Sequence, residues 1–530
     1  MSVVDEVWER LEQQPGSAGL IAMLQGIAAS EPADGYRLAH AMYSDRRGMS
    51  ALAPDALPIV LALARDSALP ARDEVVLALN MLVECARSQP AGRIPPAWLP
   101  AWQVCRAAAE PLVADQDPKV RWWAVDLVER PGPLSNRLRT EIEPSMRIRL
   151  LLRLGQVATP TDDQARAALA AVAGSPVLRL AALRGLNRLD PDGAAGRVDG
   201  LVDLFTDPSM PASVELLWNP ADEDYRPELS DLVLPTAEDL PAAVAARFTA
   251  RLARCGEPEL RVSALDAAWQ VLVLRPSAGP ELLTMAGALL DDPDPRVRVR
   301  AAHLLAMLGK AAAPFADRLF ALLDDLNGDE WLDGTIADFA CWALARIGDP
   351  RALPGLVWRL TAVHREQGRS WTGGDPHRPD PYDALIALPE HAEALRPQMA
   401  EWKKGGLLSA ADVLAAWDGR DAIPCEPPAG AGLDSVACRL REMRQQYRPW
   451  HETSRYRTAM VAVATLSQRG PLRPKVRAAV EHALSLDRRL SKEYYDYRAV
   501  LDDERVRDML QRALRGEAVR MPALSIPLPG

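Results

Sequence analysis

Two groups of side chains in this sequence have residue types that could bind a metal ion. Segment 325–333 carries oxygen donors at the first, third, fifth and ninth positions of a calcium-loop pattern, namely Asp325, Asn327, Asp329 and Asp333. Such a loop needs glycine at its sixth position and a bidentate glutamate at its twelfth, where this chain has Glu330 and Ile336. We therefore expect an acidic loop between helices, without calcium.

The histidines form the second group, and their spacing does not match a zinc or di-iron site. None stands four residues from another, and only His451 is followed directly by a glutamate. His377 lies near Asp375 and Asp380 in a Gly/Pro-rich stretch, where aspartates are typical of turns. The sequence also lacks a nucleophile elbow, a phosphate loop and a dinucleotide fingerprint. We expect no catalytic residue, no metal and no cofactor.

A recurring phrase indicates which elements build the protein: an acidic turn, a proline, then an alanine-rich helix. In its clearest copy Asp294 can cap the helix, Pro295 suits the first helical position and Gly309 closes it. Apolar residues recur at helical spacing on one face, at Val297, Ala301, Leu304, Leu305 and Leu308. Related helices are predicted to begin at Pro118, Pro176 and Pro258, and another to end before Gly348.

Equivalent alanines in these copies give a repeat period near 40 residues. Ala264 and Ala301 lie 37 residues apart, and Ala301 and Ala340 lie 39 apart. Ala182 precedes Ala264 by 82 residues, or two units of 41. This period, divided into two helices and two short turns, resembles the HEAT repeat of armadillo-like solenoids.

A motif adds to that resemblance, because HEAT units typically pair an aspartate with a basic residue six positions on. Asp115 precedes Arg121 and Asp292 precedes Arg298 by this spacing. The resemblance implies that these four residues form a structural ladder of hydrogen bonds between neighbouring repeats. Weaker copies have Ala173 and Cys255 in place of the aspartate, so we expect the ladder to be discontinuous.

These patterns predict an all-α protein, an α-solenoid of HEAT-like helix pairs with a smaller C-terminal helical region. A solenoid accommodates 530 residues because each repeat packs only on its neighbours. We expect the solenoid over 1–424, with irregular stretches near 207–241 and 368–381. A linker is predicted at 425–432, a basic helical region at 433–515 and a proline-containing tail at 516–530.

Charge divides unevenly at the predicted linker. The whole chain carries a net charge of −10, with +7 in residues 433–530 and −17 in residues 1–432. The basic part alternates arginines with aromatic residues, which could contact an acidic partner or this chain's own acidic part: Arg444, Tyr447, Arg448, Trp450, Arg455 and Arg457. A solvated helix face with arginine stems over apolar surface is the alternative interpretation, and the favoured one.

Composition bears on the cellular setting. Arginine outnumbers lysine about ninefold, which is typical of GC-rich bacterial coding. Six scattered cysteines indicate reduced thiols, and the acidic amphipathic start does not resemble a signal peptide. No run of eighteen apolar residues is present to insert into a membrane. We expect a bacterial cytoplasmic protein.

Two function classes remain. The first is a non-enzymatic scaffold or adaptor that binds another protein through the solenoid surface. The second is a HEAT-like nucleic-acid-binding enzyme resembling the alkylpurine DNA glycosylases, which the acidic first part of the chain disfavours. A bilin lyase-like role depends on repeat similarity alone. Continuous positive charge along the concave face would favour nucleic acid, whereas acidic or apolar patches there would favour a protein partner.

Overall fold

The computed structural model describes residues 3–44, 48–89, 93–217, 227–329, 332, 334–361, 379, 381–404, 408–418, 437–438, 440, 452–490, 497–520 and 522. The chain forms two compact units, Met1–Leu229 (unit 1) and Ser230–Gly530 (unit 2). The division falls inside the stretch 207–241, where prolines interrupt the helical pattern. The predicted linker 425–432 lies outside the described residues, as does all of the stretch 368–381 except 379 and 381.

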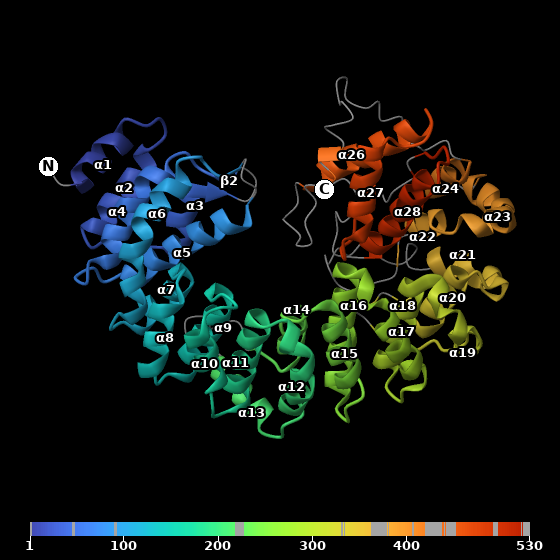
Figure 1. Cartoon of the computed structure of the whole chain (residues 1–530), viewed down its shortest axis with the longest axis horizontal. Helices are drawn as coiled ribbons and strands as arrows, with labels where there is room; N and C mark the ends of the chain where they lie inside the picture. Colours follow the sequence, from blue (N-terminus) through green and yellow to red (C-terminus); the bar gives the residue numbers. More distant parts are fainter. Residues whose placement is uncertain are drawn as a thin grey trace. The chain divides into compact units, whose positions relative to one another are not determined.

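Most of the described residues are helical, which confirms the predicted all-α class (Figure 1). Within the described ranges, strands occur only as two short antiparallel pairs. In unit 1, β1 (Tyr43–Ser44) pairs with β2 (Gly48–Met49). In unit 2, β3 (Gly328–Asp329) pairs with β4 (Gly334–Thr335).

Unit 1 stacks helix pairs in two layers. One layer contains the neighbours α3, α5 and α7, then α9, α11 and α13, while α4 and α6, then α8 and α10, line up behind them. The α-helices of unit 1 are α1 (Val3–Glu12), α2 (Ala18–Ala28), α3 (Gly35–Met42), α4 (Ala53–Arg65), α5 (Arg72–Ser88), α6 (Trp98–Ala109), α7 (Pro118–Ala124), α8 (Pro131–Thr140), α9 (Pro144–Val157), α10 (Asp163–Ala170), α11 (Pro176–Leu189), α12 (Val198–Phe205) and α13 (Met210–Val214).

Unit 2 continues the same construction and then adds C-terminal helices. Helices α16, α18 and α20 pack side by side, and α15, α17 and α19 pack behind them. The α-helices of unit 2 are α14 (Val233–Glu238), α15 (Ala242–Leu252), α16 (Pro258–Leu274), α17 (Gly279–Ala288), α18 (Pro295–Leu308), α19 (Ala316–Ala321), α20 (Ile336–Ile347), α21 (Leu353–Thr361), α22 (Pro381–Ile386), α23 (Ala392–Lys404), α24 (Leu408–Trp417), α26 (Glu452–Ser467), α27 (Pro474–Ser485) and α28 (Tyr497–Leu514).

Helix α18 shows how the recurring phrase sets the helix ends. The Asp294 side chain accepts a hydrogen bond from the backbone N–H of Arg296, and Pro295 occupies the first helical position. Gly309 ends the helix at φ +56°, a conformation that favours glycine. Both ends therefore lie where the sequence predicts them.

Small buried residues let neighbouring helices approach closely. The alanines that gave the repeat period, Ala264, Ala301 and Ala340, are completely buried in α16, α18 and α20. Val297, Leu304 and Leu305 of the predicted α18 core face are buried as well, while Leu308 is half-buried. Close-packed alanine faces leave little void, so each helix pair depends on its neighbours for burial.

The C-terminal helices pack on the repeats of unit 2. Helix α28 contacts α16 and α18, and the Tyr497 ring meets the edge of the Trp342 ring of α20 at a centroid distance of 6.5 Å. Arg489 donates a hydrogen bond to the Leu272 carbonyl of α16 (2.7 Å) and pairs with the fully buried Asp503 (3.1 Å). These buried contacts join the C-terminal helices to the repeats, and the same helices also share a buried apolar cluster of their own.

Candidate functional site

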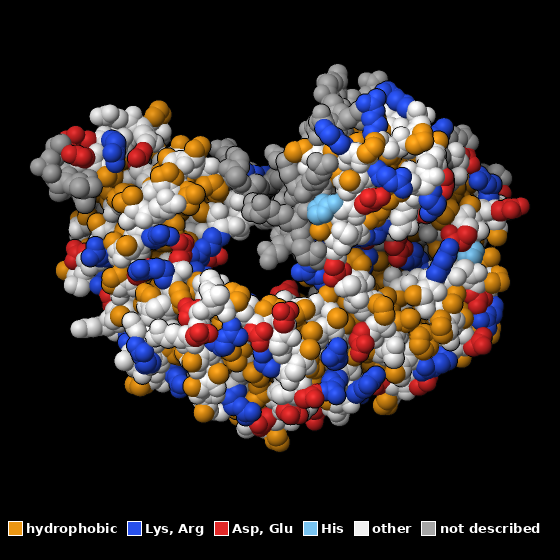
Figure 2. Space-filling model, in the orientation of Figure 1, with side chains coloured by type: hydrophobic (Ala, Val, Ile, Leu, Met, Phe, Trp, Pro, Cys, Tyr) orange, Lys and Arg blue, Asp and Glu red, His pale blue; other side chains and the backbone are white. Residues whose placement is uncertain are grey.

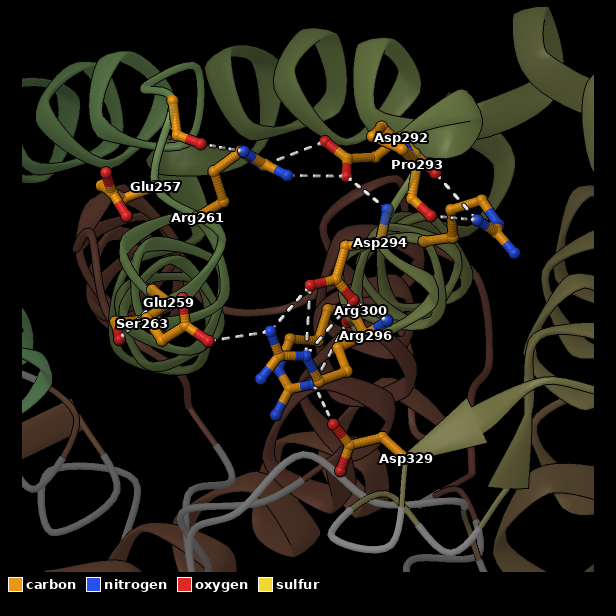
Figure 3. Close-up of polar contacts among 12 residues, drawn as sticks. Glu257, Glu259, Arg261, Ser263, Asp292, Pro293, Asp294, Arg296, Arg300 and Asp329 are labelled. Atoms are coloured by element: carbon orange, nitrogen blue, oxygen red, sulfur yellow. Dashed lines mark hydrogen bonds and ion pairs between the residues drawn. The ribbon is translucent and has the colours of Figure 1, made fainter.

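The turns between paired helices of unit 2 are joined by arginines that bind two turns at once (Figure 3). Arg261 Nη1 donates to the carbonyls of Cys255 (3.3 Å) and Gly256 (2.9 Å) in its own turn, and Nη2 donates to Asp292 Oδ1 (3.1 Å) in the next. Arg298 repeats this arrangement one unit further on. It donates to the Asp292 carbonyl at 2.8 Å and to Asp325 Oδ2 at 2.9 Å.

The same arrangement occurs in unit 1. Arg121 Nη1 donates to the Asp115 and Gln116 carbonyls, both at 2.8 Å, and its Nε lies 3.5 Å from Glu141 Oε2. The Asp115 carboxylate accepts a hydrogen bond from Arg72. The aspartate and the arginine six residues later therefore do not pair through their side chains. The arginine binds the aspartate's carbonyl, whereas the carboxylate binds an arginine of the preceding unit.

This geometry shows why Arg261 keeps its contacts although Cys255 replaces the aspartate in its own turn. The position six residues before the arginine needs only a backbone carbonyl, which any residue provides. The aspartate matters to the preceding repeat instead. The sequence pattern could not show this distinction. The aspartate and the arginine lie in the same local motif, but the aspartate carboxylate binds the preceding unit and the arginine side chain reaches the following turn.

A second row of charges runs beside the first (Figure 3). Arg296 Nη2 bridges Asp294 Oδ2 (2.8 Å) and Glu259 Oε1 (3.1 Å). The side-chain hydrogen bond from Arg296 to Asp294 holds the pKa of Asp294 below its usual value. Arg300 donates to Asp266 Oδ1 (2.8 Å) and Asp329 Oδ2 (2.7 Å). Asp325 and Asp329, two donors of the calcium-loop pattern, thus accept hydrogen bonds from arginines.

Side chains suited to metal binding do not gather in the described parts of the chain. No group of three or more His, Cys, Asp or Glu residues with metal-binding geometry occurs among the described residues. Burial raises the pKa of the Cys341 thiol to about 12, so this thiol is protonated at neutral pH. The loop around His377 lies outside the described residues.

Unit 2 contains an open groove with a volume of about 830 Å³. Its walls come from the end of α18 with the following turn, from the end of α20, from the Ile386–Glu390 turn, from the end of α24 and from the last turns of α28. The chain after α28 completes it with Ala518, Val519, Arg520 and Pro522. The groove therefore forms only because the C-terminal helices pack on the repeats.

Apolar and charged residues share the groove lining. Ile386 and Met509 are buried beneath it, and Trp417 is half-buried with its Nε1 donating to the Leu385 carbonyl at 3.0 Å. The lining cations are Lys310, Arg346, Arg505, Arg512 and Arg520, and the lining carboxylates are Glu390, Glu504 and Asp508. The lining residues carry a net charge of +2, although the whole chain carries a net charge of −10.

Arg346 is the most buried of these cations, with 7% of its side chain exposed. Its Nη2 donates to both Glu504 oxygens, at 3.0 and 2.8 Å, and its Nε donates to the Ala306 carbonyl at 3.2 Å. Its Nη1 has no hydrogen-bond partner among the described residues. These contacts fix the guanidinium at the wall of the groove.

The predicted basic aromatic segment mostly falls outside the described residues, which exclude Arg444, Tyr447, Arg448 and Trp450. Arg455 and Arg457 lie in α26. The contact of this segment with a partner stays a proposal. The groove itself could not be found from sequence, because its walls are distant along the chain.

Charges of both signs are interspersed over the visible face of each unit, without a continuous area of either sign (Figure 2). Nucleic-acid binding typically requires a local basic face. Among the described residues, no helix is both long and apolar enough to cross a bilayer.

The fold is a HEAT-like α-solenoid. No protein-family model and no curated protein matches the sequence. Among solved structures, the chain is similar to Kap121p bound to Ste12p, with 12% identity, a TM-score of 0.39, and coverage of 97% of this chain and 65% of that one. It is also similar to importin beta, with 13% identity, a TM-score of 0.28, and coverage of 96% of this chain and 56% of that one. For the cargo-free exportin Cse1 the identity is 10% and the TM-score 0.34, with coverage of 96% of this chain and 66% of that one.

Proposed function

We propose that this chain is a non-enzymatic scaffold or adaptor that binds another protein, and that the groove of unit 2 is its binding surface. The observation that carries the proposal is the groove lining, which combines apolar side chains with charges of both signs. Protein interfaces typically have an apolar centre and a polar rim. Leu308, Pro389 and Trp417 supply the accessible apolar part, and the flanking charges supply the rim.

The openness of the groove favours a polypeptide over a small molecule. Small-molecule sites typically bury most of the ligand surface. Here Lys310, Ala311, Pro389, Asp508 and Arg520 line the groove and are exposed to solvent. A segment of a partner protein could lie along such a surface and continue beyond both ends.

The nucleic-acid enzyme is not supported by the described residues. The charges in Figure 2 are mixed, and the acidic residues that could serve a glycosylase in the inter-helix turns are bound to arginines. The arginine-rich composition supports a bacterial host, and the scattered cysteines support a cytoplasmic setting.

Affinity purification from the native host, with mass spectrometry of the bound proteins, tests this proposal when a groove-filling variant is compared with a matched control. Ala311→Trp places a large side chain at an exposed position of the groove, and Thr284→Trp does the same on the exposed face of α17. We expect one or more proteins to bind the wild type and Thr284→Trp but not Ala311→Trp. The same proteins on all three baits would contradict the proposal.

A further inference from the structure

The stretch after α28 presents backbone groups beside the groove. Helix α28 ends at Leu514, Gly516 follows with a φ of +85°, and the Glu517 N–H donates to the Arg512 carbonyl. Beyond it, the Val519 N–H donates to Ser467 Oγ at 3.1 Å, and the Val519 carbonyl accepts from Gln468 Nε2 at 3.2 Å. Both polar groups of Val519 therefore point toward the end of α26.

Ala518 and Arg520 flank Val519 in the chain. Neither residue has a backbone hydrogen bond among the described residues, and both line the groove. Their backbone N–H and C=O groups can therefore form hydrogen bonds with an added extended segment, as in peptide recognition by strand addition.

The charges of the groove indicate which segment fits. The lining carboxylates Glu504 and Asp508 already face cations, Glu504 at 2.8 Å from Arg346 and Asp508 at 3.8 Å from Arg512. Lys310 and Arg520 are exposed and form no ion pair within the described residues. Glu390 is likewise without an ion pair there, so the available charge still favours an anion.

The remaining contacts come from the guanidinium of Arg346 and from the apolar lining. Arg346 offers Nη1 from a side chain that is 93% buried, and Glu504 and the Ala306 carbonyl hold it in place. A held donor loses little conformational entropy when it binds a carboxylate. Leu308 and Trp417 are half-buried in the lining and can contact an apolar side chain nearby.

We infer that the groove binds an extended acidic segment of a partner protein, in which a carboxylate faces Lys310 and Arg520 and an apolar side chain contacts Trp417. This inference rests on the proposed function, because it names the partner chemistry of the same groove. The alternation of acidic and apolar side chains fits an extended segment, whose successive side chains point in opposite directions.

The test uses two fluorescein-labelled octapeptides and the full chain, with fluorescence anisotropy as the readout. One probe alternates glutamate with leucine, and the other alternates glutamine with leucine. We expect the glutamate probe to bind about tenfold more tightly, and added salt to reduce the difference. Equal affinity for the two probes, or no binding of either probe to the wild type, would overturn the inference.

Charge reversal then locates the site. Lys310→Glu with Arg520→Glu should remove the preference for the glutamate probe. Arg247→Glu with Arg254→Glu makes the same change in net charge at exposed residues outside the groove and should preserve it. Loss of the preference in the control pair, or its retention in the groove pair, would contradict the inference.

The two proposals fail differently in these experiments. If both probes bind equally and Ala311→Trp abolishes their binding, the groove is a protein-binding surface without acidic preference, and only the further inference is wrong. If Ala311→Trp retains every captured host protein, the proposed function of the groove is wrong.

Discussion

Arg346 at the end of α20 binds both carboxylate oxygens of Glu504 in α28, a residue 158 positions further along the chain. The contact joins a repeat helix to the C-terminal region at the wall of the groove. The strength of this ion pair depends on burial. The Arg346 side chain is 7% exposed, whereas the Glu504 side chain is 42% exposed. Solvent therefore screens one side of the pair.

Glu504→Gln should destabilise unit 2 by about 1–2 kcal/mol, because a nearly buried guanidinium loses its charged partner while the glutamate side of the pair is already solvated. The exchange of backbone amide hydrogens should rise first in α28, because this helix carries Glu504. Asp508→Asn, at a more exposed carboxylate of the same helix, serves as the control. Equal exchange in Glu504→Gln and the wild type would show that this pair does not hold α28.

Gly309→Ala should destabilise the protein more than Gly348→Ala. Both glycines end repeat helices at positive φ, +56° and +93°, so alanine is strained at each. A Cβ at Gly309 would lie 3.0 Å from Arg346 Nη2, whereas a Cβ at Gly348 would have no atom within 4 Å. Chemical denaturation of the two variants measures the difference, and a greater loss in Gly348→Ala would contradict the crowding described at Arg346.

Asp292→Ala should loosen the contact between α16 and α18 by about 3 kcal/mol, because it leaves the mostly buried Arg261 without a carboxylate. Hydrogen exchange of the two helices is the appropriate readout, since a repeat array need not unfold in a single step. Asp324→Ala, at an exposed aspartate in the next turn, should have little effect. Loss of partner binding with unchanged exchange in Asp292→Ala would instead make Asp292 a contact residue.

Acid should weaken the cap of α18. Hydrogen bonds from the Arg296 side chain, and then from its backbone N–H, hold the pKa of Asp294 below its unfolded value of about 3.9, against the opposing effect of burial. A lowered folded pKa stabilises the protein above pH 4, and this stabilisation is lost as pH falls through the folded pKa. Asp294→Asn keeps a good cap but not the charge.

Thermal unfolding between pH 7 and pH 3 checks this sign. The melting temperature of the wild type should fall more than that of Asp294→Asn over this range. Equal falls in the two proteins would show that Asp294 does not contribute to the pH dependence.

Local sequence signals predicted the local structure well. Asp294, Pro295 and Gly309 set the ends of α18 because caps depend on residues within one turn. The ladder motif located Asp292 and Arg298 but not their partners, because Asp292 binds Arg261, 31 residues earlier. Nothing local could predict the groove, whose wall pairs Arg346 with a residue 158 positions away.

Site-specific photo-crosslinking tests the central claim most directly. A benzophenone amino acid placed at Ala311 reports contacts in the groove, and the same group at Thr284 reports contacts on α17. In cells of the native host, we predict crosslinks from Ala311 to an acidic segment of a partner protein, and none to that partner from Thr284. Crosslinks to the same proteins from both positions, or only to this chain itself from Ala311, would contradict the claim that the groove binds a partner.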